Sequence, residues 1–254
     1  MPSRPLTALL TLAVCLFSFA PQAVAGRIVL ANDEWPTGNT GFTNAPDVAN
    51  YVQNIASLFA DGGAGTFHGY STNFSLTESS LAAEFAAGGH TYTTGTDITF
   101  NLATLLTYDG IFFAGEPGNI SVLTDYVNAG GNVYLAGGTT SNAAVVANFW
   151  NPFLNLYGLG FESTISTSPG GAIEPIESTH PIFANVSELY QAGGQGVLDL
   201  DPNDMRNQVL EFNESGVGLY ALYDASLVIP LPAVAWLFPA GLIAGVAWMR
   251  RRTV

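Results

Sequence analysis

Hydrophobic and polar positions along the chain follow two alternating patterns, which predict strands and helices in turn. Short apolar runs predict buried strands over residues 27–31, 66–70, 90–93, 109–114 and 132–136. Helical spacing of apolar residues predicts helices over 46–60, 120–129 and 143–157, and Thr77 offers an N-cap for another helix that ends at Ala87. This alternation predicts an α/β fold, a three-layer sandwich with a mostly parallel sheet.

The pattern weakens after Gly158, where shorter strands are expected over 161–165, 196–200, 208–212 and 218–223. We expect these strands to complete one edge of the sheet or to pack against it as a small β addition. No internal repeat or long linker divides the body of the chain. Residues 26–224 therefore form one predicted domain.

The first 25 residues have the pattern of a signal peptide. Arg4 precedes an apolar core over residues 6–20, and the small residues Ala23 and Ala25 mark a site for signal peptidase before Gly26. An uncleaved N-terminal anchor is the alternative interpretation. The only cysteine, Cys15, lies in this segment, so the mature protein is expected to lack disulfides, cysteine nucleophiles and thiolate metal sites.

The C-terminal end has the pattern of a membrane span. Residues 225–249 contain no charged side chain, and a helix of this length crosses a hydrocarbon layer about 30 Å thick. Arg250, Arg251 and Arg252 follow it and mark the end that stays in the cytoplasm. Residues 225–254 are thus expected to hold the protein at a membrane through a transmembrane helix.

A proline motif stands at the start of this segment, formed by Val228, Pro230, Leu231, Pro232 and Ala233. With the apolar helix and the arginines, it resembles the PEP-CTERM sorting tail in its VPLPA-type variant, although Ile229 is inserted. The resemblance implies an exosortase as partner. It also implies export to the envelope or extracellular matrix of a Gram-negative bacterium. An uncut, ordinary single-span anchor is the alternative.

The charge of residues 26–224 excludes several functions. All 20 acidic residues lie there with only Arg27 and Arg206 as bases, which leaves a formal charge of −18. Such a surface repels nucleic acid and anionic lipid, so no nucleic-acid partner is expected. The chain has no lysine for Schiff-base chemistry. The carboxylates are scattered, which favours a role in solubility over calcium binding.

Two glycine-rich segments carry a second resemblance. Residues 109–118 resemble the strand and loop on the oxyanion side of class I glutamine amidotransferases, and residues 131–138 resemble their nucleophile strand. The resemblance implies a flavodoxin-like sheet over residues 27–185. The family's cysteine nucleophile is missing, because Ala136, Gly137 and Gly138 stand at its place. His180-Pro181 resembles the triad His-Pro, but Ile182 stands where the triad glutamate belongs. A non-catalytic domain without a cofactor is expected.

Several polar residues follow predicted strands, where open α/β sheets bind their ligands. Asp33 and Glu34 follow the first strand, and Glu116 and Thr139 follow two others, so together they can line a crevice for a cation or a sugar. The alternative is that Asp33 caps the strand end and Glu34 is solvated. Trp35 is the best candidate for stacking on a sugar ring. The segment Asp33-Glu34-Trp35 also resembles the opening of other exported proteins of this sorting class.

Histidines offer little further chemistry. His180 is either a general base or a hydrogen-bonded structural residue. His68 and His90 lie far apart in the sequence without a third ligand nearby, so no metal site is expected.

Two classes of function remain. The first is a non-enzymatic surface or matrix protein, associated with the envelope or with extracellular polysaccharide. The alternative is a carbohydrate hydrolase or metal-dependent hydrolase that uses Asp33, Glu34 and Glu116, for which paired carboxylates must lie roughly 5–10 Å apart.

Overall fold

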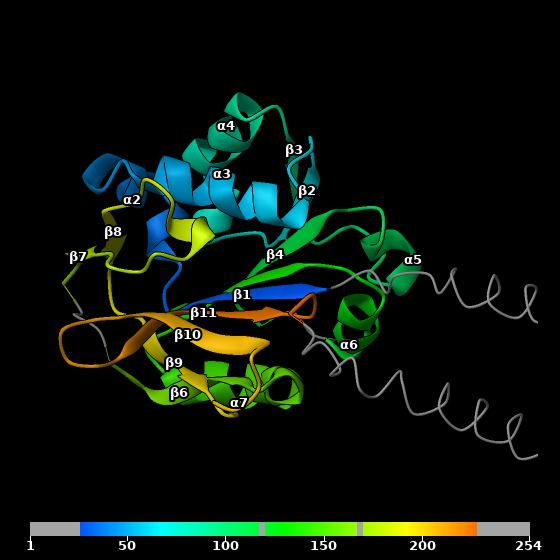
Figure 1. Cartoon of the computed structure of the whole chain (residues 1–254). Coiled ribbons are helices and arrows are strands. Elements are labelled where there is room, and N and C mark those ends of the chain that lie inside the picture. The colour runs from blue at the N-terminus through cyan, green and yellow to red at the C-terminus, as the bar shows by residue number, and fades with distance from the viewer. Residues whose placement is uncertain (1–25, 117–119, 167–169, 228–254) are drawn as a thin grey trace, which may run out of the picture.

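The computed structural model describes residues 26–116, 120–166 and 170–227. Its centre is a seven-stranded sheet in the order β10-β11-β1-β5-β4-β2-β3 (Figure 1). Five neighbouring strands run parallel: β1 (Arg27–Ala31), β5 (Val133–Ala136), β4 (Gly110–Ala114), β2 (Thr66–Tyr70) and β3 (Thr91–Thr94). The other two strands, β11 (Gly218–Asp224) and β10 (Asn207–Phe212), run antiparallel.

Helices cover both faces of this sheet. One face carries α3 (Val48–Phe59) and α4 (Ser79–Ala87), with the short α2 (Asn39–Asn44) at their end (Figure 1). The opposite face carries α5 (Leu102–Leu105), α6 (Ser121–Asn128) and α7 (Ala143–Leu154). Short 3₁₀ helices lie at η1 (Trp35–Thr37), η2 (Ser75–Thr77), η3 (Asn155–Tyr157) and η4 (Pro181–Phe183). The prediction of an α/β fold with a mostly parallel sheet is confirmed.

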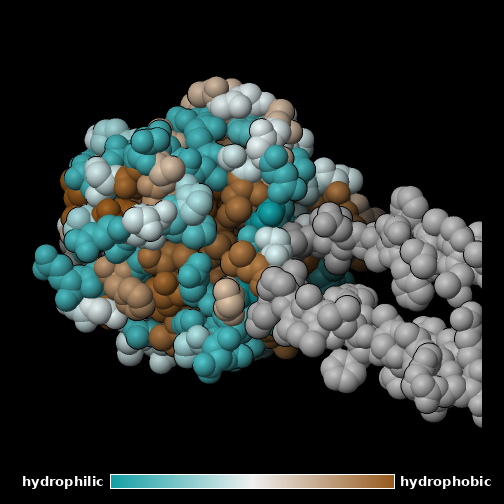
Figure 2. Space-filling view, in the orientation of Figure 1, coloured by the Kyte–Doolittle hydropathy of each residue, from teal (hydrophilic) through white to brown (hydrophobic). Residues whose placement is uncertain are grey.

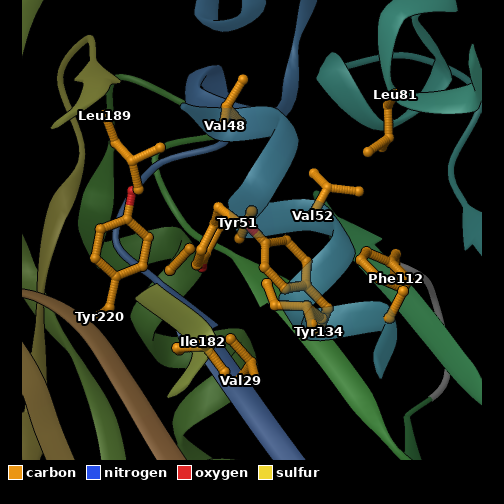
Figure 3. Packing of buried hydrophobic residues seen from close by; sticks show 14 of the residues in the cluster. Val29, Val48, Tyr51, Val52, Leu81, Phe112, Tyr134, Ile182, Leu189 and Tyr220 are labelled. Carbon is orange, nitrogen blue, oxygen red and sulfur yellow. The ribbon is translucent and has the colours of Figure 1, made fainter. Parts of the chain in front are cut away.

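Successive residues of the central strands point to opposite faces, and both faces are apolar. On β1, Val29 packs in the core that contains α3, where Figure 3 shows it next to Ile182, whereas Ile28 and Leu30 pack in the core on the α6 and α7 side. Strands buried on both faces lose the polar alternation of surface strands. This is why they are visible in the sequence as continuous apolar runs.

Two further pairs of short strands flank the sheet. β6 (Leu159–Ile165) pairs with β9 (Gln195–Asp199), and β7 (Ala172–Pro175) pairs with β8 (Glu188–Gln191), both antiparallel. The expected C-terminal strands therefore take both of the roles considered for them. β10 and β11 extend the sheet, and β9 belongs to a small addition. β7 and β8 were not predicted, because they are four residues long and their residues are mostly polar or partly exposed.

One predicted helix start is wrong. α4 begins at Ser79 with Glu78 as its N-cap residue, and Thr77 instead ends η2, where its hydroxyl donates to the carbonyl of Phe74. A threonine favours both positions, since its side chain bonds to nearby backbone in a turn as readily as at a cap. The extra turn moves Glu78 to the junction between η2 and α4.

Both ends of the described domain lie at the amino edge of the parallel strands. Arg27 pairs in register with Asp224, and the amide of Ala225 donates to the carbonyl of Gly26 at 3.2 Å. Arg27 also forms ion pairs with Asp61 at 3.0 Å and Asp224 at 3.4 Å. The chain therefore enters and leaves the domain on one side.

The predicted signal peptide and sorting tail lie outside the described residues. Within residues 26–116, 120–166 and 170–227, none of the helices has the length and apolar character needed to cross a membrane. The surface of this domain mixes hydrophilic and hydrophobic residues on the face seen in Figure 2.

Core packing on β4 gives a test of this architecture. Phe112 is 1% exposed and contacts the rings of Phe59, Phe67, Phe85 and Tyr134. Phe112→Ala is expected to lower the free energy of unfolding by about 3–5 kcal/mol in a urea titration. Phe212→Ala is the matched control, because Phe212 is 53% exposed, and it should change stability by about 0.5 kcal/mol or less. Equal effects of the two substitutions would contradict the placement of β4 in the core.

Candidate functional site

Loops from the parallel strands meet at the carboxyl edge of the sheet, opposite the edge where the chain enters and leaves. The loop after β1 carries Asp33, Glu34 and Trp35, and the loop after β2 carries Phe74 and Ser75. β1 and β2 are separated in the sheet by β5 and β4. The two loops nevertheless contact each other, because η1 packs against η2.

Glu34 joins these two loops. Glu34 is only 8% exposed, and its Oε2 accepts the amide of Ser75 at 2.7 Å. The Ser75 hydroxyl donates in return to the Glu34 carbonyl and lies 3.2 Å from the hydroxyl of Thr37. Burial is the main cause that raises the pKa of Glu34 to about 7, and the nearby charges of Asp33 and Glu78 act in the same direction. The carboxyl is thus buried without a positive partner in the described chain.

A pocket of about 250 Å³ opens beside Glu34. Trp35 forms an open wall of this pocket and is 41% exposed. Glu78 supplies a second carboxylate, whose Oε2 accepts the amide of Asn39. The lining consists of two carboxylates, two aromatic rings, two hydroxyl residues and a glycine: Glu34, Glu78, Trp35, Phe74, Ser75, Thr77 and Gly38.

Phe74 stands in this pocket with an unusual backbone conformation. Its φ of 64° and ψ of 176° lie in a region that residues with a Cβ rarely adopt. Such a conformation costs on the order of 1–3 kcal/mol and is found preferentially at ligand-binding positions. Gly115, at the end of β4, makes room for the ring, since a Cβ there would lie 2.7 Å from Phe74. The fold therefore maintains a strained phenylalanine at the pocket.

Asp33 has a different role from its neighbour. It is 0% exposed, and its carboxylate accepts the amides of Ala192, in the loop between β8 and β9, and of Trp35 at 3.3 Å. Gly138, after β5, fits against it, because a Cβ there would lie 2.8 Å from Asp33 Oδ1. Burial raises the pKa of Asp33 to about 6. Asp33 thus joins its own loop to the loop between β8 and β9 and does not line the pocket.

The other residues expected in the crevice lie elsewhere. Glu116 is exposed, and Thr139 Oγ1 is buried with no hydrogen-bond partner in the described chain. His180 caps η4, where its Nδ1 accepts the amide of Ile182 at 3.4 Å. Burial lowers its pKa, and the charge that acts on it is that of Asp224, at the amino edge. Of the six residues proposed from the sequence, the pocket brings together Glu34 and Trp35.

Histidines and carboxylates do not assemble into a metal centre in this domain. Among the described residues, no group of three or more His, Cys, Asp or Glu side chains is placed to hold a metal ion. His68 contacts Thr93 Oγ1 at 2.7 Å and the Gly95 carbonyl at 3.0 Å, and His90 accepts the amide of Gly65 at 2.9 Å. Both histidines therefore join β2 and its loops to the segment around β3.

Glu78 was not predicted as a site residue from the sequence, and Phe74 was not assigned a position in the site. Both lie after β2, whose carboxyl end had not been considered as part of the crevice. The available signal was the position itself, because a loop after a parallel strand lies at the same edge as the loop after β1.

No protein-family model, curated protein or solved structure matches the chain.

The two buried carboxyls predict a pH dependence of stability. Their pKa values in the folded chain, about 6 for Asp33 and about 7 for Glu34, exceed the ordinary values of 3.8 and 4.5. The folded state therefore binds more protons, and the stability present below about pH 4 is lost as the pH rises through 6 and 7. One pKa unit corresponds to about 1.4 kcal/mol, so each carboxyl accounts for roughly 2–3 kcal/mol.

Urea titrations of Glu34→Gln and Asp33→Asn between pH 4 and pH 8 test this pH dependence of the free energy of unfolding. Each variant should lose roughly 2–3 kcal/mol of the decline seen in the unsubstituted chain. Glu177→Gln, at an exposed carboxylate, serves as the control and should keep the full decline. An unchanged pH slope in Glu34→Gln would show that this carboxyl is ionised like a solvated one.

Proposed function

We propose that this protein is a non-enzymatic surface or matrix protein that is exported, sorted through its C-terminal tail, and associated with extracellular polysaccharide. In this proposal residues 1–25 are removed by signal peptidase, and an exosortase processes the tail near Pro230-Leu231-Pro232. The α/β domain then lies outside the inner membrane, in the envelope or the extracellular matrix of a Gram-negative bacterium. Its pocket at Trp35 binds a sugar of the polymer.

The observation that carries the proposal is the composition of this pocket. Trp35 presents an exposed aromatic face beside carboxylates that accept hydrogen bonds from hydroxyl groups. A volume of about 250 Å³ is below the roughly 300–1,000 Å³ of pockets for drug-sized ligands, and suits a ligand such as one sugar residue. Phe74, in its strained conformation, adds a second ring to the lining.

The position of the pocket also supports the proposal. Gly26 and Ala225 meet at the amino edge of the sheet, whereas Trp35 follows the carboxyl end of β1. A strand of five residues spans about 16 Å, so the pocket and the tail attachment lie at opposite ends of the domain. A domain tethered through its C-terminus would therefore present the pocket away from the membrane.

The residues of the loop after β5 support a non-catalytic role. We infer a flavodoxin-like arrangement close to that of class I glutamine amidotransferases, in which the loop after β5 would carry the cysteine nucleophile. This chain has Gly137, Gly138 and Thr139 there. His180 caps η4 and is not among the residues that line the pocket.

A carbohydrate hydrolase is the second candidate, and one observation favours it. Glu34 has a pKa of about 7 and shares its pocket with Glu78, which is the kind of pair that glycosidases use as acid and nucleophile or base. Of the residues first considered for this role, Asp33 is enclosed and Glu116 is exposed outside the pocket. The hydrolase proposal therefore uses Glu34 and Glu78.

Sorting is tested by the C-terminus of the mature protein in the producing cells. Mass spectrometry is expected to find a protein that begins at Gly26 and ends near Ala233. A chain truncated before Val228 should be released in soluble form, because it has lost the apolar segment. A mature protein that keeps Arg250-Arg251-Arg252 would favour the ordinary anchor, and a truncated form still bound to membranes would contradict the proposal.

Sugar binding is tested with the full-length chain in a polyoxyethylene ether detergent, whose headgroup is neither a sugar nor an amine. Calorimetric titration with β-linked oligosaccharides should give binding that Trp35→Ala weakens at least tenfold, about 1.4 kcal/mol. Phe212→Ala, at another exposed ring, should leave it unchanged. The absence of binding to every oligosaccharide would refute the proposal. Chromatography of the recovered sugar separates a binder, which leaves it intact, from a hydrolase.

A further inference from the structure

The pocket beside Trp35 is rich in acceptors and poor in donors. Five of its seven lining residues donate their backbone amide within the protein: Trp35 to Asp33 Oδ1, Gly38 to the Trp35 carbonyl, Ser75 to Glu34 Oε2, Thr77 to the Phe74 carbonyl and Glu78 to the Ser75 carbonyl. The hydroxyls of Ser75 and Thr77 also donate inward, to the carbonyls of Glu34 and Phe74. The groups that remain for a ligand are mainly carboxylate oxygens and aromatic faces, together with one donor, the indole N–H of Trp35.

Only some of the hydrogen-bond acceptor positions on the Glu34 and Glu78 carboxylates are occupied within the protein. Glu34 and Glu78 each accept a backbone amide at Oε2. An ionised carboxylate has about four acceptor positions. Both side chains therefore retain acceptor capacity on the walls of the pocket.

Positive charge is absent from this edge of the described domain. Its two bases lie at the amino edge, where Arg27 pairs with Asp61 and Asp224, and Arg206 pairs with Asp204 at 2.6 Å. The amide of Asp224 donates to the Arg206 carbonyl, which places Arg206 at the same edge as Arg27. The repulsion among Asp33, Glu34 and Glu78 is thus uncompensated by the protein itself.

An ammonium group meets each of these conditions. It has donors and no acceptors, it neutralises a buried carboxylate, and it is attracted to the faces of tryptophan and phenylalanine. A uronic acid would bring another negative charge among three carboxyls. An N-acetylated sugar would bring a carbonyl acceptor into a pocket that offers it few donors.

We propose that the pocket lined by Glu34, Trp35, Phe74 and Glu78 binds the protonated amine of an amino sugar in a polysaccharide with free, deacetylated amino groups. This proposal rests on the proposed function, because it names the class of sugar that the same pocket takes. Trp35 stacks on the ring, and the two glutamates receive the ammonium group.

The test compares probes that differ in charge. The full-length chain, in the polyoxyethylene ether detergent at pH 7, is titrated in a calorimeter with a glucosamine hexamer, an N-acetylglucosamine hexamer, a galacturonate hexamer and choline. The glucosamine hexamer should bind at least tenfold more tightly than the N-acetylated one, and the galacturonate hexamer should bind least. Higher salt should weaken the binding of the glucosamine hexamer.

Substitutions of Glu34 and Glu78 test whether their carboxylates cause the preference for the glucosamine hexamer. Glu78→Gln and Glu34→Gln should each weaken the glucosamine hexamer at least fivefold and leave the N-acetylated hexamer within about twofold of its original affinity. Glu177→Gln should change neither. Glu78 is half-buried, so Glu78→Gln provides a second variant should Glu34→Gln disturb the folding of the loop.

The outcomes separate this inference from the proposed function. Equal or tighter binding of the N-acetylated hexamer, or glutamine variants that keep the preference for glucosamine, would overturn the inference while sugar binding stands. Binding of choline alone would overturn the amino-sugar ligand and point to a small ammonium compound. Failure of every hexamer and of choline would overturn both proposals.

Discussion

The carboxyl edge of this domain is organised around carboxylates that are buried without a cation. Burying a charge is expensive unless hydrogen bonds or an opposite charge compensate for it. Asp33 receives backbone amides from two loops and is enclosed, whereas Glu34 receives one amide and faces a pocket. The loops after β1, β2 and β8 are held in place by these bonds. Stability at this edge therefore depends on both residues, whereas the proposed ligand binding depends on Glu34.

The sheet explains why these carboxylates come together. β1 has a hydrogen-bonded partner on each side, antiparallel β11 and parallel β5, and its residues are buried from both faces. A strand in this position has little freedom, so it carries Asn32, Asp33 and Glu34 out of the core at a fixed point. The loop that follows must then pack over the edge towards η2, where Ser75 meets Glu34. The termini, at the opposite edge, leave this packing undisturbed.

Much of this fold could be predicted from the sequence, because its strands are buried on both faces. The strands at Arg27–Ala31 and Gly110–Ala114 are apolar runs bounded by turn residues, and such runs predict buried strands. β7 and β8 have no such run. Leu189 of β8 and Ile176, which follows β7, pack into the core that contains α3, a contact made only in the folded chain.

The site was less predictable than the fold. Glu34 and Trp35 could be placed at the carboxyl edge, since that follows from strand direction alone. Their partners could not, because β1 and β2 are not neighbours in the sheet, and the meeting of their loops depends on how η1 and η2 pack. Asp33 is enclosed whereas Glu34 faces the pocket, and this difference likewise depends on the loop at Ala192.

Glu34 is a buried carboxyl without a positive partner in the described chain, and we propose that a ligand supplies one. A carbon-13 NMR titration of its side-chain carboxyl, with Glu34→Gln to assign the signal, tests this directly. Glu34 should have a pKa of about 7 in the free chain and a lower pKa when the glucosamine hexamer is bound. A pKa near the ordinary 4.5 in the free chain, unchanged by the sugar, would contradict it.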